Sequence, residues 1–80
     1  MGVPRIEAEW AERASRHLKA ELKRAGITYD GLANLLKKQG FKDETKGTVA
    51  YKLSRGTVTA TFFLASLAAI GCEAIRPEDI

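Results

Sequence analysis

Apolar residues recur at intervals of four along the first third of the chain. This spacing places them on one stripe of a helix expected over residues 7–25: Trp10, Ala14, Leu18 and Leu22. Gly26 follows as a left-handed C-cap, and Ile27 is placed to fold back onto the last turn. The pattern therefore predicts one long amphipathic helix that ends at a glycine.

Two shorter helices are predicted in the middle of the chain, each lying between a capping residue and a glycine. The first runs from an N-cap at Thr28 to a stop at Gly40. The second is capped by Asp43 or Thr45 and ends at Gly56. Small and aliphatic side chains form their inward faces: Leu32, Leu35 and Leu36 in one helix, and Val49, Ala50 and Leu53 in the other.

A fourth helix is expected from a cap at Thr59 or Thr57 to a stop at Gly71. Its inward positions are predicted to be Phe63, Leu64, Leu67 and Ile70. Because Phe62 and Phe63 are adjacent, we expect only one of them to face the core. The other would leave a small apolar patch of the kind that marks interfaces.

These elements predict an all-α fold, a compact bundle of four to five short helices. Residues 1–80 are expected to form one domain, with an ordered core at about 7–73 and a C-terminal tail at 74–80. One Cys and one His cannot supply the four ligands of a zinc site, and no catalytic motif is present. We expect no metal, no cofactor, no small-molecule substrate and no enzyme activity.

The sequence has no apolar stretch long enough to predict a membrane-spanning segment. The longest, residues 60–72, is too short and too interrupted by polar residues and glycine to span a bilayer. The first residues lack the apolar segment of a secretory signal. A single cysteine suits a reducing compartment, so we expect a cytoplasmic protein.

The net charge of +3 is unevenly distributed along the chain. Residues 1–18 are neutral, residues 19–55 carry +5, and residues 56–80 carry −2. A clustered positive surface attracts polyanions, above all nucleic acid. An ordinary solvated surface is the alternative interpretation of the same charges.

The outward face of the third helix carries side chains suited to a DNA major groove. Thr48, Tyr51 and Arg55 lie opposite its buried stripe, and Lys52 flanks them. Arg can donate two hydrogen bonds to guanine, Thr can contact a base, and Tyr and Lys can reach phosphates.

Three segments resemble the Cro/CI-type (lambda-repressor-like) helix-turn-helix family. The run from Leu22 to Ala33, LKRAGITYDGLA, is similar to the opening of the motif. VAYKLSRG at 49–56 resembles the end of the recognition helix, and TATFFLASLAAIGC at 59–72 resembles the helix that follows. The order of elements is closer still to a group of short uncharacterised bacterial proteins that share features seen here as EWxxRA, KLSRG and ATFFL.

The resemblance implies a DNA-binding regulator of transcription that acts as a homodimer on duplex DNA. It assigns base contacts to the recognition helix, at Thr48, Tyr51, Lys52 and Arg55. It assigns DNA-backbone contacts to Thr28 and Tyr29 at the start of the second helix, and the positive segment adds Lys37, Lys38 and Lys46. One departure stands out: residues 37–46 are several residues longer than the family's tight turn. This enlarged turn and an outward Phe favour the alternative, an interaction or adaptor module that does not bind DNA.

Overall fold

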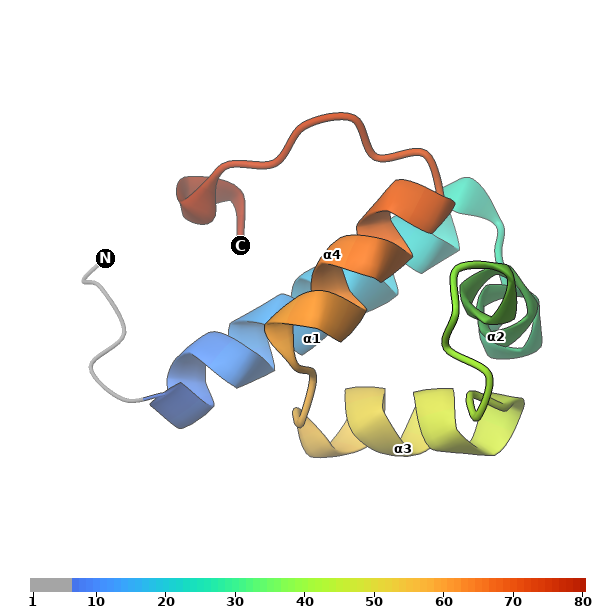
Figure 1. The fold of residues 1–80 in the computed structure, drawn as a ribbon. Coiled ribbons are helices and arrows are strands. Elements are labelled where there is room, and N and C mark those ends of the chain that lie inside the picture. Colours follow the sequence, from blue (N-terminus) through green and yellow to red (C-terminus); the bar gives the residue numbers. More distant parts are fainter. Residues whose placement is uncertain (1–6) are drawn as a thin grey trace.

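The computed structural model describes residues 7–80, which form four α-helices and one short 3-10 turn. In chain order these are α1 (Glu7–Ala25), α2 (Tyr29–Lys38), α3 (Lys46–Arg55), α4 (Ala60–Ala69) and the 3-10 turn η1 (Pro77–Asp79). Helices α1 and α4 lie side by side, α3 crosses below them, and α2 closes one end of the bundle (Figure 1). The described residues contain no strand, so the predicted all-α class is confirmed.

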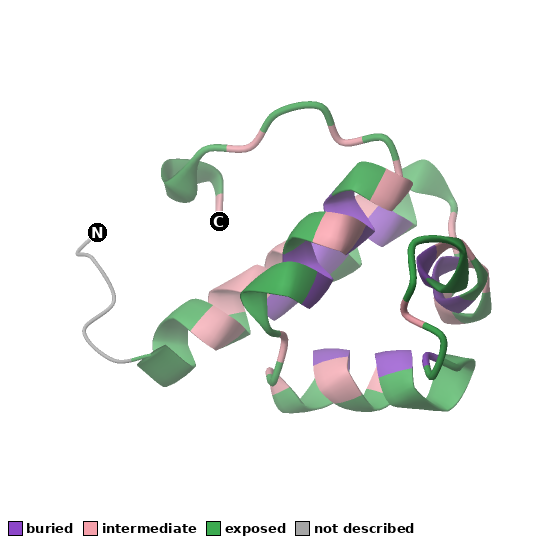
Figure 2. Cartoon of the chain, viewed as in Figure 1, coloured by how far each residue is buried: buried purple, intermediate pink, exposed green. Residues whose placement is uncertain are grey.

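One apolar core joins the four helices. Its buried members come from every helix: Leu18, Leu22, Leu32, Ala33, Leu36, Val49, Leu53, Phe62, Phe63 and Leu67. The buried stripes of the helices face one another and the exposed stripes face outward (Figure 2). The four-residue spacing therefore correctly placed Ala14, Leu18 and Leu22 of α1 against the core, whereas Trp10 at the start of the same stripe is 37% exposed.

Threonine hydroxyls begin the three shorter helices, as the sequence indicated. Thr28 Oγ1 accepts the Gly31 N–H at 3.0 Å, and Thr59 Oγ1 accepts the Phe62 N–H at 3.2 Å. Helix α3 begins with a reciprocal box, in which Thr45 and Thr48 each accept the other's backbone N–H. Of the paired alternatives, the structure selects Thr45 over Asp43 and Thr59 over Thr57.

Gly26 and Gly56 end α1 and α3 in the left-handed conformation. Gly26 has φ +71°, and the following Ile27 N–H donates to Leu22 O at 3.0 Å, which folds Ile27 back onto the core. Gly56 has φ +66° and ends α3 directly against α1, where an added Cβ would lie 3.6 Å from the Cα of Glu12. The end of α3 therefore packs closely against the first half of α1.

Two predictions for α4 are wrong. Phe62 and Phe63 are both buried, at 1% and 8% exposure, whereas Leu64 is 58% exposed. The reason is that α4 packs against both α1 and α2, so its buried arc is wide enough for two adjacent rings. The outward apolar side chain is Leu64, which the spacing had placed inside.

The C-terminal tail folds back onto α1. The Arg13 guanidinium donates to the backbone carbonyl of Ile80, with an Nε–O distance of 2.9 Å, and Ile75 and Ile80 pack against the core. No helix among residues 7–80 is long and apolar enough to cross a membrane.

Candidate nucleic-acid interface

Two of the four predicted base-contacting residues project from the outer face of α3. Tyr51 is 59% exposed and Arg55 is also exposed. They lie one turn apart, and the Arg55 Cζ is 5.5 Å from the centre of the Tyr51 ring. The ring therefore supports the guanidinium and limits its freedom while leaving its N–H donors available.

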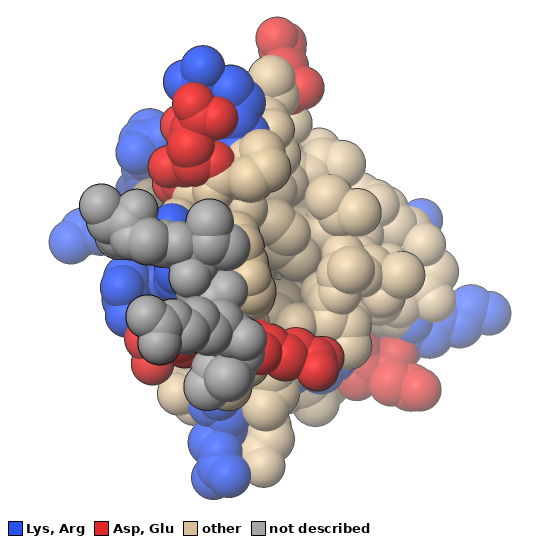
Figure 3. All heavy atoms as spheres, turned by 90° about the vertical axis from the view of Figure 1, so that its left-hand side faces the viewer, with Lys and Arg blue, Asp and Glu red and all other residues tan. Residues whose placement is uncertain are grey.

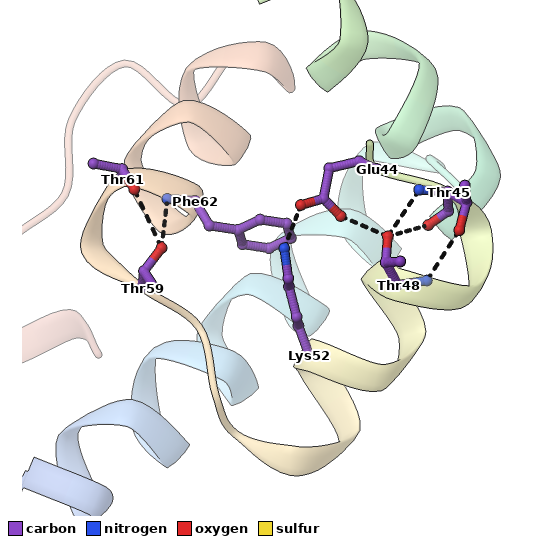
Figure 4. Close-up of polar contacts among 7 residues, drawn as sticks. All are labelled: Glu44, Thr45, Thr48, Lys52, Thr59, Thr61 and Phe62. Carbon is purple, nitrogen blue, oxygen red and sulfur yellow. Dashed lines mark hydrogen bonds and ion pairs between the residues drawn. The ribbon is translucent and has the colours of Figure 1, made fainter. Parts of the chain in front are cut away.

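The other two, Thr48 and Lys52, take part in contacts within the protein (Figure 4). The Thr48 hydroxyl donates to Glu44 Oε1 at 2.7 Å, and the Lys52 ammonium pairs with Glu44 Oε2. The same ammonium lies 4.8 Å from the centre of the Phe62 ring. Thr48 and Lys52 are thus both engaged with Glu44 in the loop before α3, and Lys52 also contacts α4 through Phe62.

Glu44 organises this cluster, and its pairing with Thr48 and Lys52 was not predicted from the sequence. Its carboxylate is 7% exposed and has one partner on each oxygen. Because Glu44 precedes the N-cap of α3, the positive end of the helix dipole adds to its stabilisation. A carboxylate beside Asp43 in a polar loop looks solvent-exposed, and only the turn into the helix brings Thr48 and Lys52 to it.

The predicted DNA-backbone residues fall into two groups. Lys37, Lys38 and Lys46 are exposed and flank the connection between α2 and α3. Thr28 caps the other end of α2, and Tyr29 is half-buried against the core. Because α2 has ten residues, about 15 Å of helix separates the two groups.

The connection between α2 and α3 is a seven-residue segment, residues 39–45. Phe41 anchors it, because its N–H donates to Leu36 O at 3.0 Å and its side chain packs against the core. The extra length seen in the sequence is therefore a loop and not a longer helix. It still leaves α2 and α3 in direct contact.

One segment of the chain carries no charge. Residues 56–72, which include all of α4, contain no charged residue. Figure 3 shows a broad uncharged area, with basic and acidic side chains gathered toward its margins and below it. Within residues 7–80, no group of three or more His, Cys, Asp or Glu side chains is placed to hold a metal ion.

A family model matches residues 10–75 of the chain; its description is "Domain of unknown function (DUF6471)". The chain belongs to this family. The DUF6471 match takes in α2, α3 and α4 completely and α1 from Trp10 onward, so it includes the Tyr51–Arg55 pair and the Glu44 cluster. No curated protein and no solved structure matches the chain. The likeness to Cro/CI-type proteins therefore stays a prediction.

Proposed function

We propose that this DUF6471 protein is a small sequence-specific regulator of transcription that binds duplex DNA through a Cro/CI-type helix-turn-helix made of α2 and α3. The observation that carries the proposal is the exposed Tyr51–Arg55 pair on the outer face of α3. This pair lies in the segment of residues 19–55, whose net charge is +5. Such a face matches the negative potential and the acceptor-rich floor of a major groove.

Each member of the pair has a distinct part in this proposal. Arg55 donates two hydrogen bonds to O6 and N7 of a guanine, the commonest specific contact in the major groove. Tyr51 donates its hydroxyl to a phosphate and holds the guanidinium in place. Since the side chain of Arg55 is already restricted, less conformational entropy is lost on binding.

We expect the other predicted contact residues to contribute less to the binding energy than Tyr51 and Arg55. Lys37, Lys38 and Lys46 are exposed and can neutralise phosphates without giving up a buried contact. Thr48 and Lys52 could reach DNA only by leaving Glu44, so we expect their share of the binding energy to be small. Thr28 and Tyr29, at the far end of α2, would contact a more distant phosphate.

The proposal includes a homodimer. A single recognition helix reads only a few base pairs, so a specific operator requires two modules related by a two-fold axis. The two α3 helices would then lie about 34 to 36 Å apart, which is one turn of DNA.

An electrophoretic shift on a mixed-sequence duplex, repeated at several salt concentrations, tests the proposal. We expect binding at low salt that weakens steeply as salt rises. Arg55→Ala should weaken binding, whereas Arg76→Ala, which removes the same charge from the exposed C-terminal tail, should not. Absence of any shift at about 50 mM salt would contradict DNA binding, since phosphate contacts are strongest there.

The second candidate is a protein-interaction module without DNA binding. It is favoured by the 58% exposure of Leu64 on a helix that carries no charge. Capture of one acidic partner protein, lost in Leu64→Asp and kept in Arg55→Ala, would support this candidate in place of the first.

A further inference from the structure

A polar groove lies between α1 and the end of α3. Its volume is about 380 Å³, and it is lined on one side by residues of α1 and on the other by the last residues of α3 and Gly56. The groove exists because Gly56 brings the end of α3 to the backbone of α1 at Glu12. It lies beside the outer face of α3, and Arg55 belongs to both.

The charges around this groove favour an anion. Three cations line it, namely Arg16, Lys19 and Arg55, against one carboxylate, Glu12. Glu12 Oε1 already pairs with Arg16 Nη2 at 2.7 Å, so the groove keeps a net charge of about +2. The partial negative charge at the end of α3, about half a unit, opposes this but does not cancel it. A phosphate group, which carries about one to two negative charges, balances the remainder.

A buried hydroxyl in the wall of the groove lacks a partner. Ser15 is 2% exposed, and its Oγ has no hydrogen-bond partner among residues 7–80. A serine inside a helix commonly donates to the carbonyl four residues earlier, and Ser15 does not. An oxygen acceptor bound in the groove would give this donor a partner.

We propose that this groove binds a phosphate group, held by the cations of Arg16, Lys19 and Arg55 and by the Ser15 hydroxyl. The phosphate could belong to the DNA backbone or to a free phosphate compound, since both present the same oxygens. A DNA-backbone phosphate as the ligand rests on the proposed function, and it would add a DNA-backbone contact from α1 next to the base contact of Arg55. A free phosphate compound as the ligand does not depend on the proposed function.

Amide chemical shifts of the intact chain, titrated with inorganic phosphate at constant ionic strength, test the groove directly. We expect saturable shifts confined to residues around Ser15, Lys19 and Gly56. Lys19→Gln should weaken binding by about fivefold, as expected for an exposed ion pair, and Ser15→Ala should weaken it several-fold with the fold retained. Lys23→Gln, an exposed lysine on the same helix but outside the groove, is the matched control and should leave phosphate affinity unchanged.

The same variants on duplex DNA separate the two sources and the two proposals. If phosphate and DNA both bind and Lys19→Gln weakens both, the groove holds a backbone phosphate. If phosphate binds and DNA does not, the DNA proposal fails and the groove stands as a site for a free phosphate compound. The groove proposal is overturned, whether or not DNA binds, by either of two results. One is that phosphate gives no saturable shift at the groove, and the other is that Lys19→Gln weakens phosphate binding no more than Lys23→Gln does.

Discussion

Replacing Lys52 by Met should destabilise the fold, because it leaves the Glu44 carboxylate without its cation. Glu44 is 7% exposed, whereas the Lys52 side chain is 35% exposed. Breaking a buried ion pair costs about 3 to 5 kcal/mol, and breaking an exposed one costs about 0 to 1. With one buried and one half-exposed partner, we expect a loss of about 2 kcal/mol. Methionine also removes the cation–π contact of the ammonium with Phe62, so the loss combines that contact with the ion pair.

A loss of about 2 kcal/mol is a large share of the free energy of unfolding of a domain of this size. An 80-residue domain is stabilised by roughly 4 to 12 kcal/mol. With an m-value of about 1 kcal/mol/M in urea, the unfolding midpoint should fall by about 2 M. Far-ultraviolet circular dichroism measures the midpoint, and Lys37→Met on the exposed side of α2 is the control.

A double-mutant cycle then isolates the pair. Glu44→Gln keeps the hydrogen bond with Thr48 but removes the charge, so adding it to Lys52→Met should recover about 1 kcal/mol or more. If Lys52→Met shifts the midpoint no more than Lys37→Met does, or if the effects of Lys52→Met and Glu44→Gln are simply additive, the Glu44 cluster does not stabilise the fold.

Two further substitutions test the core and its unsatisfied hydroxyl. Ser66→Ala should raise the unfolding midpoint by an amount equivalent to about 1 kcal/mol, because Ser66 is fully buried with no partner for its Oγ among residues 7–80, and alanine also favours the helix. A fall in the thermal midpoint would show that this hydroxyl makes a bond. Leu53→Ala should cost about 2 to 5 kcal/mol in urea titrations, since Leu53 is 1% exposed and joins α3 to the core. A cost below about 1 kcal/mol would mean that α3 is not packed as described.

The helices were predictable from sequence because their signals are local. The four-residue spacing and Gly26 define α1, whose bounds, Glu7–Ala25, are those expected. Threonine caps and glycine stops lie within one turn of the groups that they satisfy. The residues that begin and end each helix can therefore be predicted without knowledge of the fold.

The sequence-based predictions were wrong or incomplete where packing between distant segments determines which side chains are buried and which groups they contact. Spacing along α4 cannot reveal that two helices cover it, so Phe62 and Leu64 were assigned to the wrong sides. Glu44 gains its partners only when the loop turns into α3. The groove joins residues about 40 positions apart, Ser15 and Arg55, and no local pattern connects them.

The affinity of the Arg55→Ala variant for a DNA site selected from a random duplex library tests the central claim most directly. Fluorescence anisotropy at physiological salt, with Arg76→Ala as control, gives the dissociation constants. We predict that selection enriches a two-fold symmetric site and that Arg55→Ala weakens binding to it by roughly 1 to 3 kcal/mol with an unchanged unfolding midpoint. Failure to enrich any sequence, or equal affinity of Arg55→Ala and Arg76→Ala for the selected site, would contradict sequence-specific DNA binding by the outer face of α3.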